Sequence, residues 1–189
     1  MSHKENLRDQ YRRIREGLPA SARKSAARKI LAQLMMTLEF IGTKTVAVYV
    51  SKGSEVDTHS LIQALARKKI RIAAPKVVQN KLHFFPIRSI KDCAPGTFGV
   101  LEPKSSKAID PKELDVILVP GIVFDSKGYR IGYGKGFYDQ LLSALNLFNT
   151  IGLSYDQTLV PNLPRDGHDV PVNWLITPSR TLCLTHEQK

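Results

Sequence analysis

The chain has 189 residues, and its 42% hydrophobic content is enough to bury a core, so we expect one domain covering residues 1–189. It contains no run of about eighteen apolar residues and no apolar leader after its charged N-terminus, which argues against a membrane span and a secretory signal, so we expect a cytoplasmic protein. We also expect a monomer, although no sequence feature reports the oligomeric state. The net charge of +11 suits either a nucleic acid or a small polyanion, but no recognised nucleic-acid-binding motif accompanies it, so we expect a small-molecule partner.

The N-terminal region predicts two helices. Residues 3–18 form a basic amphipathic stretch whose apolar side chains recur at steps of three and four, and Pro19 ends it. These apolar side chains are Leu7, Tyr11, Ile14 and Leu18. We expect most cations of this helix, Arg12 and Arg15 among them, to be solvated. A second helical pattern covers about 21–40.

The chain continues with a strand, a turn and a helix. Residues 45–50 are β-branched and apolar, which predicts a strand ending at Val50. In open α/β sheets, ligands bind beyond the carboxyl ends of the strands, so Glu55 in the following turn is a candidate substrate contact. For Glu55, an exposed surface carboxylate is the simpler explanation on composition alone.

Five further strands are predicted, over residues 70–74, 81–87, 116–119, 150–155 and 180–185. Pro75 ends the first of these, and Pro86 makes the second an edge strand. The alternation of strands and helices predicts an α/β fold, namely a single three-layer α/β/α domain with a mostly parallel open sheet. We expect the N-terminal helical pair, residues 1–40, to pack on the sheet of an α/β core formed by residues 41–189.

The most informative stretch runs from Asp115 to Leu142, with the sequence DVILVPGIVFDSKGYRIGYGKGFYDQLL. Its order is a strand buried on both faces, a glycine-rich loop, and a helix predicted over 137–147. The loop glycines are Gly128, Gly132, Gly134 and Gly136. Glycines let backbone N–H groups converge on one point, and a helix N-terminus adds the positive end of its dipole. The loop therefore suits an anion such as phosphate, although a plain glycine-rich turn is the alternative.

Charged side chains around this loop indicate what it holds. Lys135 within the loop and Arg130 at its entrance can reach phosphate oxygens, so both are candidate catalytic residues. Asp139, just past the loop, can hold a magnesium ion that bridges those oxygens. Two common motifs are excluded, because Gly136 stands where a P-loop needs Ser or Thr, and Asp139 stands where the dinucleotide fingerprint needs its third glycine.

This stretch resembles the loop of the 5-formyltetrahydrofolate cyclo-ligase family, whose members are also called methenyltetrahydrofolate synthetases. The resemblance lies in the segment GYRIGYGKGFYD, which closely follows the segment DVILVPGIVFD. The family's loop usually reads Arg-Leu-Gly-Tyr/Arg-Gly-Gly/Lys-Gly-Tyr-Tyr-Asp. This chain departs from that pattern at Ile131 for Leu, at Phe137 for Tyr, and at Gln140, where Arg is common. Weaker matches in the same order extend the resemblance from Lys4 to Thr177.

The resemblance implies roles for individual residues. For ATP it implies Lys4 and Arg8, from a Lys-x-x-Leu-Arg pattern, together with Arg130, Gly132, Tyr133, Gly134, Lys135, Gly136, Phe137 and Tyr138. For the folate it implies Val50, Glu55, Tyr133, Gly134, Lys135, Gly136 and Phe137, with Glu55 on the pterin ring. For magnesium it implies Asp139 together with Asp169, which follows Leu163-Pro164 as in the family.

The resemblance also implies an activity. It is the ATP- and magnesium-dependent conversion of 5-formyltetrahydrofolate, with or without a polyglutamate tail, into 5,10-methenyltetrahydrofolate, with release of ADP and phosphate through a phosphorylated formyl intermediate. Two other functions stay open. One is a different ATP- or phosphate-using enzyme on the same scaffold, which Phe137 and Gln140 leave possible. The other is a basic module that binds RNA or nucleotides without catalysis.

Overall fold

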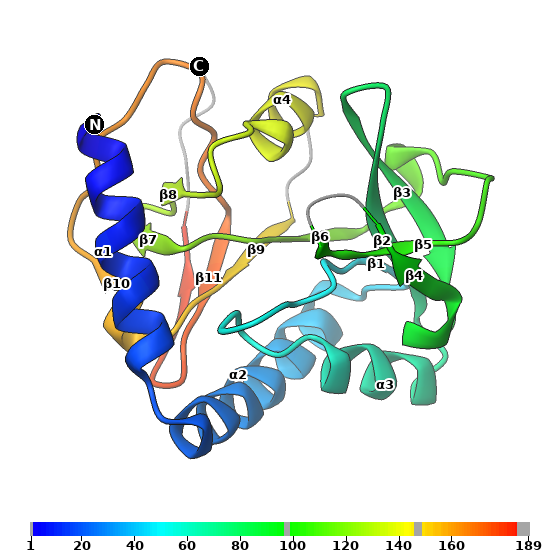
Figure 1. Cartoon of the computed structure of the whole chain (residues 1–189). Coiled ribbons are helices and arrows are strands. Elements are labelled where there is room, and N and C mark those ends of the chain that lie inside the picture. The colour runs from blue at the N-terminus through cyan, green and yellow to red at the C-terminus, as the bar shows by residue number, and fades with distance from the viewer. Residues whose placement is uncertain (1, 97–98, 146–148, 185–189) are drawn as a thin grey trace.

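The computed structural model describes residues 2–96, 99–145 and 149–184. Its centre is a seven-stranded sheet in the order β12-β11-β9-β6-β1-β2-β3 (Figure 1). These strands are β1 (Thr45–Ala47), β2 (Arg71–Val78), β3 (Lys81–Ile87), β6 (Val116–Val119), β9 (Thr150–Leu153), β11 (Trp174–Ile176) and β12 (Thr181–Cys183). The inner strands run parallel to one another, and the edge strands β3 and β12 run antiparallel to their neighbours. The predicted α/β fold with a mostly parallel open sheet is confirmed.

The central strands β1 and β6 are buried on both faces, because their side chains alternate between two hydrophobic cores. Val46 and Leu118 belong to one core. Ala47 and Ile117 belong to the other. The continuous apolar runs that predict these strands are therefore the consequence of burial on both faces.

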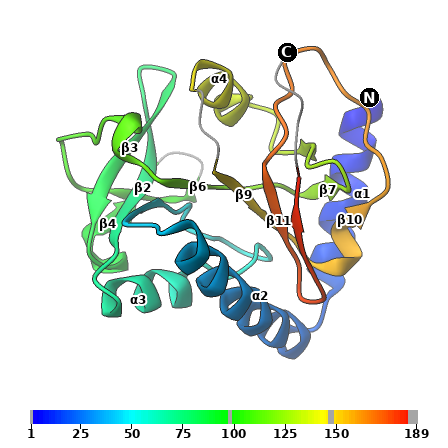
Figure 2. The ribbon, with the colours of Figure 1, turned by 180° about the vertical axis from the view of Figure 1, so that it is seen from behind.

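Helices cover both faces of this sheet (Figures 1 and 2). The long helix α2 (Ala20–Ile41) and α3 (His59–Arg67) pack on one face, where Leu34 joins the core. The helix α4 (Phe137–Ala144) packs on the opposite face through Leu142. The layers are thus helix, sheet and helix, as predicted.

The N-terminal helix α1 (His3–Gly17) lies against a small three-stranded sheet. In spatial order this sheet consists of β10 (Leu159–Val160), β7 (Val123–Asp125) and β8 (Arg130–Ile131). Leu7 and Tyr11 of α1 pack against Val123 and Ile131. This contact brings the basic helix beside the strand that leads into the glycine loop.

Several elements differ from those that the sequence predicts. The prediction that Pro75 ends its strand is wrong, since β2 continues to Val78. Because β1 pairs with β2 only as far as Ala73, the missing N–H of Pro75 removes no hydrogen bond to β1. The sequence pattern also fails to predict the short strands β7, β8, β10 and β11, and the hairpin of β4 (Cys93–Pro95) and β5 (Leu101–Pro103).

Two predicted ends, Leu147 for the helix after the glycine loop and Thr185 for the last strand, lie outside the described residues. Within the described ranges, every helix is too short or too polar to cross a lipid bilayer.

The chain order leaves a crevice between β1 and β6. From β1 the chain passes through α3, on one face, to β2, and from β6 it passes through α4, on the other face, to β9. Because these neighbouring parallel strands send their connections to opposite faces, their carboxyl ends stay uncovered, and open α/β sheets bind ligands at such a point. The turn after β1 and the chain after β6 meet at this rim.

Candidate active site

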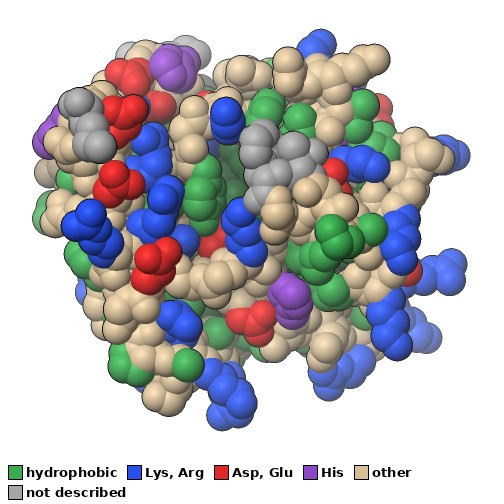
Figure 3. Space-filling model, in the orientation of Figure 1, with side chains coloured by type: hydrophobic (Ala, Val, Ile, Leu, Met, Phe, Trp, Pro, Cys, Tyr) green, Lys and Arg blue, Asp and Glu red, His purple; other side chains and the backbone are tan. Residues whose placement is uncertain are grey.

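A cleft of about 450 Å³ opens at this rim. Figure 3 shows it as a hollow near the middle of the face, with Lys and Arg side chains along its edge and hydrophobic side chains inside. It is lined by the start of α1, the turn after β1, the glycine loop with the start of α4, and residues 166–169, and the β2–β3 hairpin adds Val77 and Leu82. Every residue that the sequence analysis assigns to catalysis, ATP, folate or magnesium lines this cleft.

The glycine loop spans residues 132–136, between β8 and α4. Gly134 and Gly136 have φ angles of +90° and +67°, in the left-handed region that favours glycine, and Gly136 is the N-cap of α4. Arg8 Nε donates to the Gly132 carbonyl oxygen at 2.8 Å and ties α1 to the loop. A Cβ at Gly134 would lie in ordinary contact with the Arg8 guanidinium, at 3.4 Å, so it is the positive φ that makes any other residue there strained. The loop presents its backbone and the N-terminus of α4 to the cleft, an arrangement that binds anions.

The two cations predicted to bind phosphate have different surroundings. Lys135 is exposed on the loop. Arg130 has only 4% of its side chain exposed, and it donates to the Val170 carbonyl oxygen at 2.7 Å and to Asp139 Oδ1 at 2.9 Å. Burial lowers the pKa of Arg130, and the charge of Asp139 opposes that shift. Asp139 Oδ1 also accepts from the Val170 N–H at 3.2 Å, so Arg130 and Asp139 together bind the start of α4 to the chain after β10.

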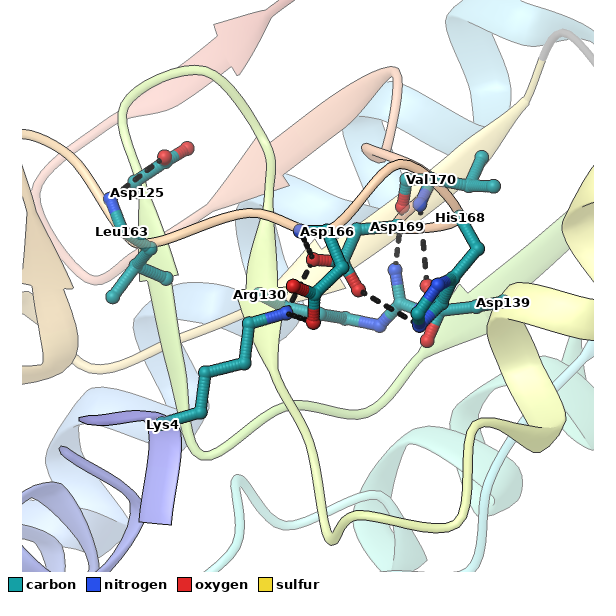
Figure 4. A network of polar contacts seen from close by, with 9 residues as sticks. All are labelled: Lys4, Asp125, Arg130, Asp139, Leu163, Asp166, His168, Asp169 and Val170. Atoms are coloured by element: carbon teal, nitrogen blue, oxygen red, sulfur yellow. Dashed lines mark hydrogen bonds and ion pairs between the residues drawn. The ribbon is translucent and has the colours of Figure 1, made fainter. Parts of the chain in front are cut away.

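A second charged group lies on the connection between β10 and β11 (Figure 4). Lys4 Nζ lies 2.5 Å from an Asp169 oxygen and 2.7 Å from an Asp166 oxygen. Ligand atoms of Asp166, His168 and Asp169 all lie within 4.8 Å of one another, close enough to hold a metal ion. Asp166 and His168 are not among the residues predicted from the sequence, although the segment Asp-Gly-His-Asp, with two carboxylates and an imidazole, is a signal that could have indicated them.

The residues present fit a magnesium ion. Carboxylate oxygens are the ligands that Mg²⁺ prefers, and Asp139 and Asp169 both line the cleft. The group of possible ligands that lie within 4.8 Å of one another contains Asp169 with Asp166 and His168, and Asp139 is outside it. Lys4 supplies the positive charge at Asp169 in this structure, so a divalent cation and Lys4 would compete for that carboxylate.

The contact of Lys4 with Asp169 predicts a pH-dependent stability. Burial opposes the charged form of Lys4, but its hydrogen bonds to Asp166 and Asp169 raise its pKa above 10.5. Burial likewise opposes the charge of Asp169, but hydrogen bonds from the Asp166 N–H and Lys4 lower its pKa below 3.8. The contact therefore stabilises the fold fully at pH values between 3.8 and 10.5, the ordinary pKa values of the two groups. It is lost as the pH falls through the folded pKa of Asp169, or rises through the folded pKa of Lys4.

We expect the substitution Lys4→Met to lower Tm by about 2–4 °C at pH 7, as loss of about 1 kcal/mol would do in a chain of this size. The difference from wild type should begin to shrink as the pH falls below 3.8 or rises above 10.5. Thermal unfolding in the presence of EDTA measures it without a competing cation. Arg12→Met is the control, because Arg12 lies 4.0 Å from Asp9 in an exposed pair. A difference that does not shrink at all as the pH is lowered from 4, or as it is raised above 10.5, would contradict the assignment.

Glu55 lines the cleft from the turn after β1, where two hydrogen bonds hold its carboxylate. Its Oε2 accepts from the Lys52 N–H at 2.8 Å, and its Oε1 accepts from the hydroxyl of Tyr133. That hydroxyl accepts in turn from Arg15 Nη2 at 3.0 Å. Burial, and then the charge of Glu55, raise the pKa of Tyr133 to about 12, so it stays a neutral donor. The prediction that Arg15 is solvated is wrong, since only 5% of it is exposed.

Tyrosines and apolar side chains form the inner wall of the cleft. The hydroxyl of Tyr138 is buried and has no hydrogen-bond partner among the described residues. Burial, followed by the charge of Glu55, raises the pKa of Tyr138, which keeps its hydroxyl protonated. Tyr49, Val50 and Phe137 also line the cleft. Because buried hydroxyl groups nearly always have partners, a ligand in the cleft is the natural partner for Tyr138.

A glycine loop at a helix N-terminus, a carboxylate held beside it, and a mixed polar and aromatic cleft at the switch point of an α/β sheet form an arrangement typical of enzymes that bind small polar ligands. The model of the 5-formyltetrahydrofolate cyclo-ligase family matches residues 1–178. The chain belongs to this family, whose members are ligases.

Individual members of this family are similar to this chain over almost its whole length. The 5-formyltetrahydrofolate cyclo-ligase of Haemophilus influenzae is 31% identical, over 89% of this chain and 94% of the relative. The enzyme of the same name from Mycolicibacterium smegmatis is 32% identical, over 94% of each chain. Among solved structures, the 5,10-methenyltetrahydrofolate synthetase of Aquifex aeolicus superimposes with a TM-score of 0.87 at 32% identity, covering 100% of this chain and 96% of that one.

Proposed function

We propose that this chain converts 5-formyltetrahydrofolate into 5,10-methenyltetrahydrofolate in a reaction that consumes ATP, requires magnesium, and releases ADP and phosphate. Membership of the cyclo-ligase family supports the overall reaction. The observation that supports the proposal is that the glycine loop and Glu55 line one cleft, because a phosphoryl transfer between two substrates needs both substrates at one place.

Glu55 is the proposed contact for the pterin ring. Each of its carboxylate oxygens has one hydrogen bond from the protein and retains acceptor capacity. The amino group and ring N–H of a pterin are adjacent donors that such a carboxylate can bind together. Val50 and Phe137 provide apolar surface along the same cleft. Phe137 lacks the hydroxyl common at this position in the family, so we propose that it contributes packing alone.

The glycine loop is the proposed site for the triphosphate. Its backbone N–H groups, the N-terminus of α4 and Lys135 supply positive charge for the γ-phosphate, and Arg8 and Lys4 extend that charge along α1. Arg130 has a different proposed role, because two of its nitrogens already bind Asp139 and the Val170 carbonyl. We assign it to positioning Asp139. Magnesium, held by Asp139 and Asp169, would neutralise charge on the phosphate oxygens.

The proposed chemistry has two steps. The formyl oxygen of the folate attacks the γ-phosphorus in line, an oxygen–phosphorus bond forms, and ADP leaves with the electron pair of the broken phosphoanhydride bond. N10 then adds to the activated formyl carbon, N10 loses its proton, and phosphate departs with the carbon–oxygen electrons to leave the methenyl bridge. This chemistry asks the protein for alignment and charge neutralisation, which the loop and Lys135 can provide, and for no covalent nucleophile.

A spectrophotometric assay tests the proposed function. Purified protein with ATP, magnesium and 5-formyltetrahydrofolate should produce the near-ultraviolet absorbance of methenyltetrahydrofolate, together with one ADP for each folate converted. ADP formation without that absorbance would indicate a different phosphate-using enzyme. Neither product, together with a salt-dependent mobility shift of RNA, would indicate a binding module instead.

We expect Glu55→Gln to raise the KM for 5-formyltetrahydrofolate by about tenfold to a hundredfold and to change the KM for ATP little. The substitution removes the charge that strengthens hydrogen bonds to the ring, and such bonds contribute about 1.5–3 kcal/mol. Glu39→Gln, on the exposed side of α2, is the control. Equal increases in both KM values would place Glu55 outside the folate subsite.

A further inference from the structure

Arg15 is a buried cation that neither the resemblance nor the glycine loop accounts for. It lies on α1 with 5% of its surface exposed. Its three guanidinium nitrogens each donate to a different acceptor. Nε reaches Ser54 Oγ at 3.0 Å, Nη1 reaches the Gly121 carbonyl oxygen at 3.3 Å, and Nη2 reaches the Tyr133 hydroxyl at 3.0 Å.

These acceptors lie on the three segments that meet at the switch point. Ser54 is in the turn after β1, next to Glu55. Gly121 follows β6, and Tyr133 is in the glycine loop. One side chain from α1 therefore joins the turn that carries the proposed ring contact to the loop that carries the proposed triphosphate site.

The link to Glu55 has a fixed hydrogen-bond direction. A guanidinium can only donate, so the Tyr133 hydroxyl accepts from Arg15 and its single proton points to Glu55. Among the ion pairs of the described residues, none includes Arg15. The negative charge connected to Arg15 by the fewest hydrogen bonds is therefore the Glu55 carboxylate, and the Tyr133 hydroxyl is the one group between them.

We propose that Arg15 is a positioning residue that sets the separation between the folate and triphosphate subsites, with Tyr133 as the connecting group. This inference rests on the proposed function and adds to it a residue that touches neither reacting atom. Arginine suits this role because its planar fork reaches three acceptors in fixed directions, which a single ammonium group cannot do. In-line transfer needs the reacting atoms about 3–3.5 Å apart, so a small change in this separation slows the reaction strongly.

The test compares Arg15→Lys, Tyr133→Phe and the double variant with wild type. Lysine keeps the buried positive charge and phenylalanine keeps the aromatic ring. Neither single variant therefore creates a large cavity that could unfold the protein. Each is expected to raise the KM for 5-formyltetrahydrofolate about tenfold and to lower kcat about tenfold, with the KM for ATP within about twofold of wild type. Arg12→Lys, on the exposed side of the same helix, is the control and should match wild type.

The double variant shows whether the two residues act as one unit. If Arg15 acts through Tyr133, the double variant should be within about threefold of the more impaired single variant, because contacting residues are not additive. Effects that multiply, or a wild-type folate KM in Arg15→Lys, would overturn the proposal. A loss of Tm with unchanged kinetic constants would also overturn it, since that result describes a structural role alone.

Isothermal titration with 5-formyltetrahydrofolate alone separates this proposal from the proposed function. If wild type binds and converts the folate while Arg15→Lys does the same with equal constants, only the positioning role falls. If wild type does not bind the folate, both proposals fall. Weaker folate binding in Arg15→Lys and Tyr133→Phe, with unchanged binding of an ATP analogue, is the result expected.

Discussion

Replacement of Lys135 by alanine is expected to lower kcat/KM by about a hundredfold or more, with little change in Tm. Lys135 is exposed on the glycine loop, in the wall of the cleft, where its ammonium can follow the charge that moves from the γ-phosphate to the leaving ADP. An interaction stronger in the transition state than in the bound substrate appears chiefly in kcat. Steady-state rates of methenyltetrahydrofolate formation at saturating ATP measure the effect.

Lys127→Ala is the matched control for this variant. Lys127 is an exposed lysine in the turn between β7 and β8, outside the lining of the cleft. Its removal changes the net charge by the same amount, so it shows how much of the loss comes from weaker long-range attraction of ATP. Near-normal turnover in Lys135→Ala would contradict the assignment of the loop as the triphosphate site.

The substitution Asp139→Asn is expected to lower the free energy of unfolding by about 3 kcal/mol and to raise the magnesium concentration needed for half-maximal activity. Arg130 has 4% of its side chain exposed, and Asp139 is its ion-pair partner at 2.9 Å. Removing one partner of a buried pair leaves the other charge without compensation, which costs about 3–5 kcal/mol. Urea unfolding without metal measures the first effect, and magnesium titration of the rate measures the second.

Glu113→Gln serves as the comparison for the stability measurement. Glu113 pairs with Arg71 at 3.5 Å, with more than half of each side chain exposed, so its loss should change stability by less than about 1 kcal/mol. Equal stability changes in the two variants would refute the structural role assigned to Asp139. An unchanged magnesium titration would separately remove Asp139 from the metal site.

The sequence predicts the parts of this molecule that depend on local patterns. The apolar run of β6 predicts a buried strand, and the glycines before α4 predict a loop with positive φ angles. The order of strand, glycine loop and helix is therefore predictable from the residues alone. Glu55 is predictable as a residue of the cleft for a topological reason, since the carboxyl ends of parallel strands meet at one edge.

Contacts between distant segments lie beyond such patterns. Arg15 contacts residues 106 and 118 positions away, at Gly121 and Tyr133, and along α1 it resembles the exposed cations near it. The pairing of Lys4 with Asp166 and Asp169 joins residues more than 160 positions apart. These polar contacts depend on how α1 docks on the small sheet.

Short strands are the other part that local patterns miss. β8 and β10 have two residues each, too few to establish a period, and their pairing with β7 depends on the surrounding packing. Without this small sheet, the approach of α1 to the glycine loop is not predictable.

A structure of the protein with magnesium and a non-hydrolysable ATP analogue tests the central claim most directly. We predict that oxygens of the terminal phosphate lie about 3 Å from backbone N–H groups of residues 132–136 and from Lys135 Nζ, with the metal on Asp139 or Asp169. A triphosphate bound away from residues 130–139 would contradict the account, and with it the assignment of the cleft as the place where the two substrates meet.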